Sequence, residues 1–450
     1  MFRLKIILFI LGAVFLSVGC SNNEITVINH NDKKLNLRAE DSYILENITN
    51  ISSNIRNFGS QGEDRASKYL EDKLKEYGYI TEIQPFSVYK QEFLQFNSSK
   101  YYFNLNPFQS ESIGESKNII GKQSNFNENK KTIYLTAHYD TTKDTIGVID
   151  NATGVAALLE IGRILKDYEL PFNIEIIFFS AEEYGMYGSK FFVSKLTDEE
   201  KSKTIGVINL DMIGEKGAGE ITVYTSSKYN NLMSITMKDY FKEKFKFLNT
   251  INSDQYSFYM GEIPAVTFSN EDAKVFNGDK QFEFLDVEQI KYTSNSIVDF
   301  LLVFDNLNSS NTLIKSKKLD LENSLVGKLK NFKLVSAKEN LISNGFSSEI
   351  IYIYLDEKGS KYELKEKDGR FTNFDKYKNI NILDKENEEM YKVVKDKYDP
   401  QKYKIIYRLG NCDGVLVSDG SLQDSLNFLD DYYKSYYKKT FGERPSKSIK

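Results

Sequence analysis

Residues 132–183 read TIYLTAHYDTTKDTIGVIDNATGVAALLEIGRILKDYELPFNIEIIFFSAEE, and this stretch decides the fold class. Its first six residues are mostly apolar β-formers, and residues 172–179 are a nearly continuous apolar run. Both segments are typical of strands that are covered on both faces. Between them, the apolar residues of 154–168 recur at helical spacing. A helix that joins two buried strands predicts a parallel strand pair.

The same alternation continues outward from this stretch. Helical spacing over 42–79 precedes it, and strand-like and helix-like segments follow it as far as residue 306. We therefore predict an α/β domain with a mostly parallel mixed sheet flanked by helices. Beyond residue 310 the sequence becomes rich in lysine, with short strand-like pieces and a tyrosine-rich end, which predicts a small C-terminal α+β module. The segments expected after the central stretch are helices at 187–195, near 231–245 and at 287–306, and strands at 204–210, 220–225 and 265–268.

The first twenty residues, MFRLKIILFILGAVFLSVGC, have the pattern of an export signal. Arg3 and Lys5 precede an apolar segment, residues 6–18, that is too short to cross a bilayer comfortably. Residues 16–20, LSVGC, resemble a bacterial lipobox, in which cleavage leaves Cys20 as the lipid-modified first residue. A plain signal peptide or a single membrane anchor is the alternative.

The resulting domain plan has four parts. We expect a lipoprotein signal peptide at 1–20, a tether at 21–40, a catalytic domain at 41–308 and the C-terminal module at 315–445. This plan predicts a protein held by lipid on the extracellular face of a bacterial cell membrane.

Composition excludes several kinds of site. The 450 residues include 2 histidines, 2 cysteines and no tryptophan. Two cysteines cannot form a Cys₄ zinc module, and a nucleophile triad would depend on His138 or His30. With Cys20 lipidated, Cys412 has no intrachain disulfide partner. The net charge of −5 gives no basic surface for nucleic acid, so we expect no nucleic-acid partner. Chemistry in this chain must depend mainly on carboxylates.

Ionisable side chains follow the predicted parallel strands at the point where each strand ends. Ligands of open parallel sheets bind at that edge. So many carboxylates beside one imidazole would repel each other, and a divalent cation such as zinc would neutralise them. The residues that we expect to meet there are His138, Asp140, Asp150, Glu182, Glu183 and Asp211.

Two of these positions suggest supporting roles. Asp140, two residues after His138, is placed to orient the imidazole. In the Glu182-Glu183 pair, one carboxylate can bind metal while the other takes a proton from water.

Four motifs of the sequence resemble the zinc aminopeptidase family M28, of the bacterial leucyl-aminopeptidase type. They are HYDTT, VIDNATGVAALLE, FFSAEEYGMYGS and NLDMIG, in that order, and the resemblance extends over about residues 45–305. It implies that Asp150 bridges two zinc ions, with His138 and Glu183 completing one of them. It further implies that Asp211 binds the other ion and that Glu182 is the general base.

One expected ligand is missing from this pattern. The family's second zinc is normally completed by a histidine that falls here at Phe276 or Asn277, and the frequent Asp-His pair is Asp254-Gln255. Three interpretations remain open. The protein is a mononuclear zinc enzyme, a two-metal enzyme in which Asp272, Asn277 or Asp279 supplies the ligand, or an inactive descendant.

The expected cofactor is accordingly one or two zinc ions per chain. The leading hypothesis for function is a membrane-tethered extracellular metallopeptidase, an aminopeptidase that removes N-terminal residues from peptides. The alternative is a non-catalytic lipoprotein of the same ancestry that binds a surface ligand.

Overall fold

The structure is a computed structural model of the 450-residue chain. The chain divides into a unit of residues 1–37 and a unit of residues 38–450. The predicted sites at Cys20, His30, Phe276, Asn277 and Asp279 lie outside the described residues. The structure describes residues 37–89, 112–226, 230–249, 253–274, 281–310, 317–318, 329, 331–342, 347–368, 381–384, 389–395, 403–409 and 412–441.

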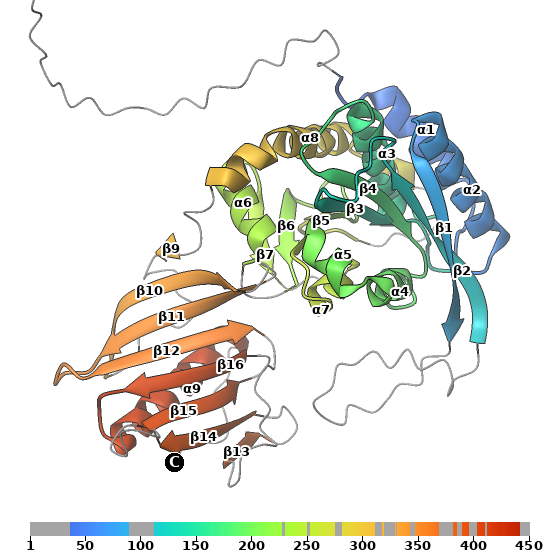
Figure 1. The fold of residues 1–450 in the computed structure, drawn as a ribbon. Helices are drawn as coiled ribbons and strands as arrows, with labels where there is room; N and C mark the ends of the chain where they lie inside the picture. Colours follow the sequence, from blue (N-terminus) through green and yellow to red (C-terminus); the bar gives the residue numbers. More distant parts are fainter. Residues whose placement is uncertain are drawn as a thin grey trace, which may run out of the picture. The chain divides into compact units, whose positions relative to one another are not determined.

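An eight-stranded mixed sheet organises the first part of the chain, in the order β1-β2-β4-β3-β5-β8-β6-β7 (Figure 1). The four central strands, β4, β3, β5 and β8, run parallel to one another. Antiparallel pairs add β1 and β2 at one side and β6 at the other. The strands are β1 (Ile80–Tyr89), β2 (Ser112–Lys122), β3 (Thr132–His138), β4 (Asn173–Phe179), β5 (Thr204–Leu210), β6 (Ile221–Thr225), β7 (Lys246–Asn249) and β8 (Ala265–Asn270).

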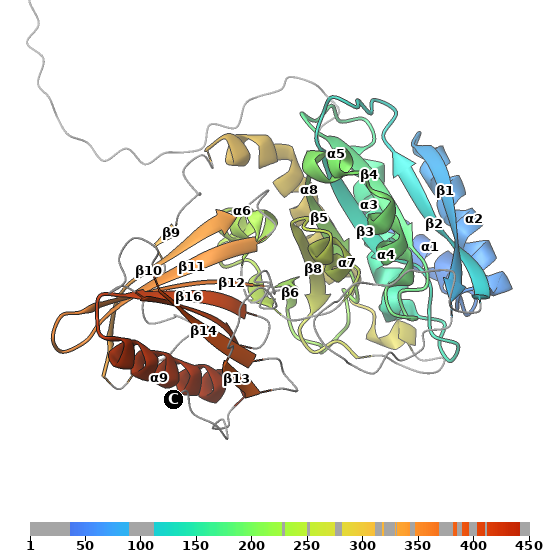
Figure 2. The ribbon, with the colours of Figure 1, turned by 60° about the horizontal axis from the view of Figure 1, so that its bottom comes forward.

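Helices cover both faces of this sheet (Figure 2). One face packs against α1, α2, α3, α6 and α8, and the other against α4 and α7. The helices are α1 (Asp41–Ile51), α2 (Gln61–Glu76), α3 (Thr153–Leu165), α4 (Tyr187–Lys195), α5 (Asp198–Lys203), α6 (Leu232–Phe241), α7 (Gln255–Met260) and α8 (Val287–Ser310), with short helices η1 (Val148–Ala152) and η2 (Gln281–Phe284).

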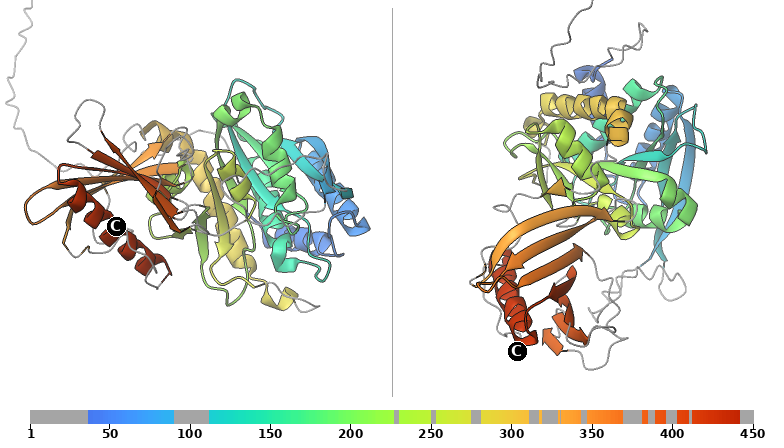
Figure 3. Two further views of the ribbon diagram at one scale, coloured as in Figure 1. Left: turned by 90° about the horizontal axis from the view of Figure 1, so that it is seen from below. Right: turned by 60° about the vertical axis from the view of Figure 1, so that its left-hand side comes forward.

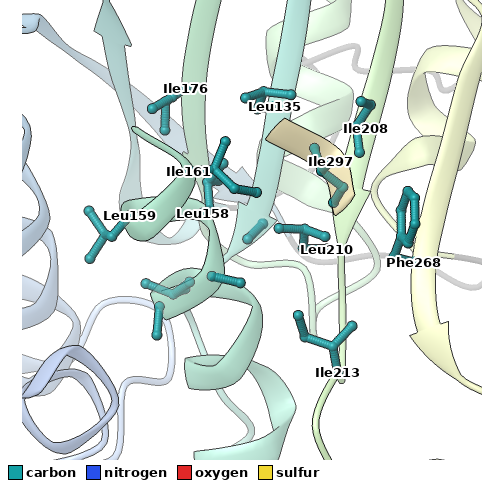
Figure 4. Close-up of a cluster of buried hydrophobic side chains, with 14 of the residues drawn as sticks. Leu135, Leu158, Leu159, Ile161, Ile176, Ile208, Leu210, Ile213, Phe268 and Ile297 are labelled. Carbon is teal, nitrogen blue, oxygen red and sulfur yellow. The ribbon is translucent and has the colours of Figure 1, made fainter. Parts of the chain in front are cut away.

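Two hydrophobic cores result from this sandwich. In β4, Ile176 and Phe178 contribute to the core on one face, and Ile177 and Phe179 to the core on the other. Strand side chains alternate between faces, which is why a strand covered on both sides is apolar throughout. Figure 4 shows the larger core, where Leu158 of α3 lies among strand side chains.

A second eight-stranded sheet, fully antiparallel, forms the C-terminal module, in the order β13-β14-β15-β16-β12-β11-β10-β9. Helix α9 (Leu422–Phe441) lies on one of its faces (Figures 2 and 3), where Phe428 packs against tyrosines of β11 and β12, and Tyr432 against a tyrosine of β15. The strands are β9 (Lys317–Lys318), β10 (Lys333–Ile342), β11 (Ser347–Leu355), β12 (Lys361–Asp368), β13 (Asn381–Asp384), β14 (Glu389–Lys395), β15 (Tyr403–Leu409) and β16 (Cys412–Ser418).

The predicted fold class is confirmed. A mixed β-sheet flanked by helices forms an α/β domain, and a second sheet with one helix follows it. The exact boundaries of the four predicted parts stay predictions. Among the described residues, no helix has both the length and the apolar character needed to cross a membrane.

Candidate metal centre

The polar residues predicted to meet at one edge come from the carboxyl ends of three neighbouring parallel strands. His138 is the last residue of β3, Glu182 and Glu183 follow β4, and Asp211 follows β5. Because β4 and β5 both pair in parallel with β3, these ends meet at the same edge of the sheet. Asp150 reaches this edge from η1, in the loop between β3 and α3.

Three of these side chains form a compact group of metal-ligand type. The Nε2 atom of His138 lies 3.2 Å from Oδ1 of Asp150 and 3.3 Å from Oδ1 of Asp211. Among the described residues, one ligand atom of each of the three lies within 4.8 Å of the others. One imidazole nitrogen and two carboxylate oxygens are donors that zinc accepts, and three protein ligands are the number found in catalytic zinc sites. The residues present therefore fit the metal that the sequence predicts.

The grouping differs from the expectation in one respect. The resemblance paired His138 with Glu183, whereas the structure groups His138 with Asp211, and Glu183 is not a member of this group. Oε1 of Glu183 is instead a buried atom with no hydrogen-bond partner in the described part of the chain. Burial, together with the charge of the neighbouring Asp150, raises the pKa of Glu183 to about 7. A second cation between Asp150 and Glu183 would offset both the cost of burying the Glu183 charge and its repulsion by Asp150.

Asp140 connects the ends of β3 and β4. Its carboxylate accepts hydrogen bonds from the backbone N–H of Glu182 at 3.0 Å and of Glu183 at 3.3 Å. Its Oδ1 also lies 3.5 Å from Nδ1 of His138, on the opposite side of the ring from the metal-ligand group. Asp140 is thus placed to hold both the imidazole and the Glu182-Glu183 segment.

The electrostatics of the metal-free site favour bound protons. Burial acts to lower the pKa of His138, but Asp211, Asp140 and Asp150 raise it well above its ordinary value. Burial raises the pKa of Glu182 well above its usual range, although His138 acts in the opposite direction. A carboxyl group with a raised pKa is suited to general acid–base catalysis near neutral pH.

Two further ionisable residues belong to this environment. Asp254 is fully buried, and burial raises its pKa to about 7, with Asp211 and Asp140 adding to the effect. Burial lowers the pKa of Lys190 to about 8, although Asp254 and Glu182 act to raise it. Sequence reasoning named Asp254 without giving it a role and did not single out Lys190. Their proximity to Glu182 depends on packing of α4 against α7, for which local sequence carries no signal.

The residues proposed to replace the missing histidine are only partly described. Asp272 is exposed on the turn after β8 and is not a member of the metal-ligand group. The other candidates, Asn277 and Asp279, lie outside the described residues.

Comparison with protein-family models gives one match at the site. Residues 118–295 match the model described as peptidase family M28. This range contains all of the strand-end residues described above.

Curated relatives match over short regions. Aminopeptidase YwaD of Bacillus subtilis is 36% identical over 119 residues, which are 26% of this chain and 26% of that protein. A vacuolar membrane protease of Candida dubliniensis is 27% identical over 229 residues, covering 50% of this chain and 23% of that protein. The matches to these two relatives therefore span only about a quarter of their length.

Solved structures share the fold. An aminopeptidase from Aneurinibacillus sp. strain AM-1 has a TM-score of 0.50 at 20% identity, covering 59% of this chain and 94% of that chain. The zinc aminopeptidase BSAP from Bacillus subtilis has a TM-score of 0.50 at 17% identity. The match covers 59% of this chain and 95% of that chain. The family model covers the strand ends on which the metal-ligand group lies, and the sheet has the fold of these aminopeptidases. Residues 118–295, which hold the metal-ligand group, therefore match peptidase family M28.

Proposed function

We propose that this protein is a zinc metallopeptidase that removes N-terminal residues from peptides. The observation that carries the proposal is the group of His138, Asp150 and Asp211 with the raised-pKa carboxyl of Glu182 beside it. Relatives that carry the name aminopeptidase support the class of substrate. The surplus of carboxylates at the site also suits a substrate with a free, protonated amino group.

The roles of the side chains follow from their positions. His138, Asp150 and Asp211 would hold zinc, which when bound polarises a carbonyl group and makes water more acidic. Glu182 takes the proton from the attacking water and then passes it to the nitrogen of the leaving amine. Asp140 keeps the imidazole of His138 and the backbone of Glu182 in place while this proton moves.

The experiment uses the full chain purified in detergent. Zinc per chain is measured, and hydrolysis is followed on a panel of aminoacyl-anilides and on the same compounds with an acetylated amino group. Glu182→Gln should retain zinc and lose about 10²- to 10⁴-fold in kcat/KM, the usual contribution of a general base. Glu199→Gln, on the exposed face of α5, is the matched control and should be unchanged.

The outcomes separate the hypotheses. Cleavage of free but not acetylated substrates supports an aminopeptidase, and equal cleavage of both would refute that specificity. No bound zinc, together with equal rates for wild type and Glu182→Gln, would refute the enzyme and favour a non-catalytic binding lipoprotein.

We also propose that lipid on Cys20 holds the protein on the extracellular face of the bacterial cell membrane. The pattern of residues 1–20 supports this proposal. Cell fractionation of wild type and Cys20→Ser tests it. Wild type should be found with the membranes and carry lipid, and the variant should carry none. A wild-type protein without lipid would contradict the proposal.

A further inference from the structure

A buried arginine lies behind the metal-ligand group. Arg56, in the connection between α1 and α2, is 0% exposed. Burial lowers its pKa to about 10, while Asp140, Asp150 and Glu183 act to raise it, so the guanidinium stays charged at neutral pH. A buried charge is costly unless its donors are satisfied, so the partners of this guanidinium define its role.

The guanidinium donates hydrogen bonds to backbone carbonyls that belong to three separate segments. Its Nε donates to the carbonyl of Tyr139, at 2.6 Å, one residue after His138. Its Nη2 donates to the carbonyl of Gly147 at 3.0 Å, and its Nη1 to that of Ile146, both in the loop that leads to Asp150. Nη1 also donates to Ile51, at the end of α1, at 3.2 Å.

The backbone of Arg56 reinforces the same connection. Its N–H donates to the hydroxyl of Thr141 at 3.0 Å, and its carbonyl accepts from the N–H of Thr141 at 3.4 Å. The guanidinium also lies close against Gly147, whose φ is +53°. A Cβ on Gly147 would lie 3.0 Å from Nη2 of Arg56 and 2.1 Å from the carbonyl oxygen of Asp150. This close approach therefore requires glycine.

We infer that Arg56 is a positioning residue that fixes both ends of the loop between His138 and Asp150, and so sets the spacing of these two metal ligands. The inference rests on the proposed function, because it assumes that these ligands hold zinc. A planar guanidinium with five donors can bond three segments at once, whereas a lysine ammonium is a single point of charge. The geometry of Arg56, rather than its charge alone, is what the site uses.

The experiment measures zinc affinity, by competition with a chromogenic chelator, in the metal-stripped full chain at a temperature where each variant is folded by circular dichroism. Arg56→Lys keeps the charge and Arg56→Met removes it. Both should weaken zinc binding by about 10- to 100-fold, the usual cost of losing a residue that orients a metal ligand. Wild-type zinc affinity in Arg56→Lys would overturn the inference.

Arg163→Lys is the matched control. Arg163 is also buried and donates to Glu160 within α3, away from the metal-ligand group. This variant should lower thermal stability and leave zinc affinity unchanged. If it weakens zinc binding as much as Arg56→Lys does, the effect is general loosening of the domain and the inference fails.

Two milder substitutions, both at Thr141, keep the test decisive if the Arg56 variants do not fold. Thr141→Val removes the hydroxyl that accepts from Arg56, and Thr141→Ser retains it. Thr141→Val should weaken zinc binding by roughly 2- to 10-fold, as expected for one hydrogen bond, with wild-type affinity in Thr141→Ser. Equal affinities in both variants would overturn the inference. Failure of the wild type to bind zinc would instead refute the proposed function.

Discussion

The grouping of His138 with Asp211, rather than with Glu183, gives a test that needs no substrate. Asp211→Asn and Glu183→Gln each replace one carboxylate by an amide of nearly the same shape. If His138, Asp150 and Asp211 form the tight zinc site, Asp211→Asn reduces its ligands from three to two. Glu183→Gln leaves that set intact, so zinc binding should depend much more on Asp211 than on Glu183.

The size of the effect follows from mass action. Loss of a residue that only orients a ligand costs about 10- to 100-fold in metal affinity, so loss of a ligand should cost at least about 100-fold. With free zinc at about 1,000 times the wild-type Kd, zinc stabilises the wild type by about 4.1 kcal/mol, and a 100-fold weaker site by only about 1.4 kcal/mol. The difference of about 2.7 kcal/mol corresponds to a Tm lower by roughly 5–10 °C for a domain of this size.

The assay is thermal unfolding of each variant with and without zinc. Comparing the zinc-induced rise in Tm within each variant removes the intrinsic effect of the substitution on stability. Asp211→Asn should lose most of the zinc-induced rise in Tm. Glu183→Gln should reduce that rise by less than about 3 °C. Equal losses, or a larger loss in Glu183→Gln, would refute the grouping and restore the expectation that His138 shares its metal with Glu183.

Two further predictions concern pH and the core. Because burial raises the pKa of Glu183 from 4.5 to about 7, the folded state binds its proton more tightly than the unfolded chain. The stability this proton contributes is lost as pH rises between these values, and His138, whose pKa is also raised, acts in the same direction. The Tm of the metal-free protein should therefore fall from pH 5 to pH 8, and a Tm that rises over this window would contradict the pKa directions. The zinc-induced rise in Tm should be larger at pH 8 than at pH 6, because zinc displaces these protons. In the core, Leu158→Ala should cost about 2–5 kcal/mol in urea unfolding, since the side chain is 0% exposed. Leu45→Ala, at a site 41% exposed, is the control, and comparable costs for the two would contradict the assignment of α3 to the core.

Local sequence predicted the secondary structure of the peptidase-like part closely. The expected helix at 187–195 is α4, the expected strand at 204–210 is β5, and the expected helix at 287–306 is the first part of α8. These elements carry strong periodic signals, because each has a face or a whole surface that must be buried.

The sequence predicted the strands of the C-terminal module less completely. The expectation of short strand-like pieces understated an eight-stranded sheet. In β12, lysine and glutamate alternate with the buried Tyr362 and Leu364, so that average composition resembles a solvated segment. A strand with one covered face is recognised by its alternation rather than by its apolar content.

The sequence by itself determined the α/β class and the strand ends that carry His138, Glu182 and Asp211. The spacing of apolar residues along the chain shows where each strand and helix lies and where it ends. Only the tertiary structure decided that Asp211 rather than Glu183 lies beside the imidazole, and that Arg56 bonds the loops around the ligands. Both depend on strand register and on the paths of separate loops, which are set by contacts between residues distant in sequence. These contacts join residues that are far apart in the sequence, so they cannot be predicted from any local pattern.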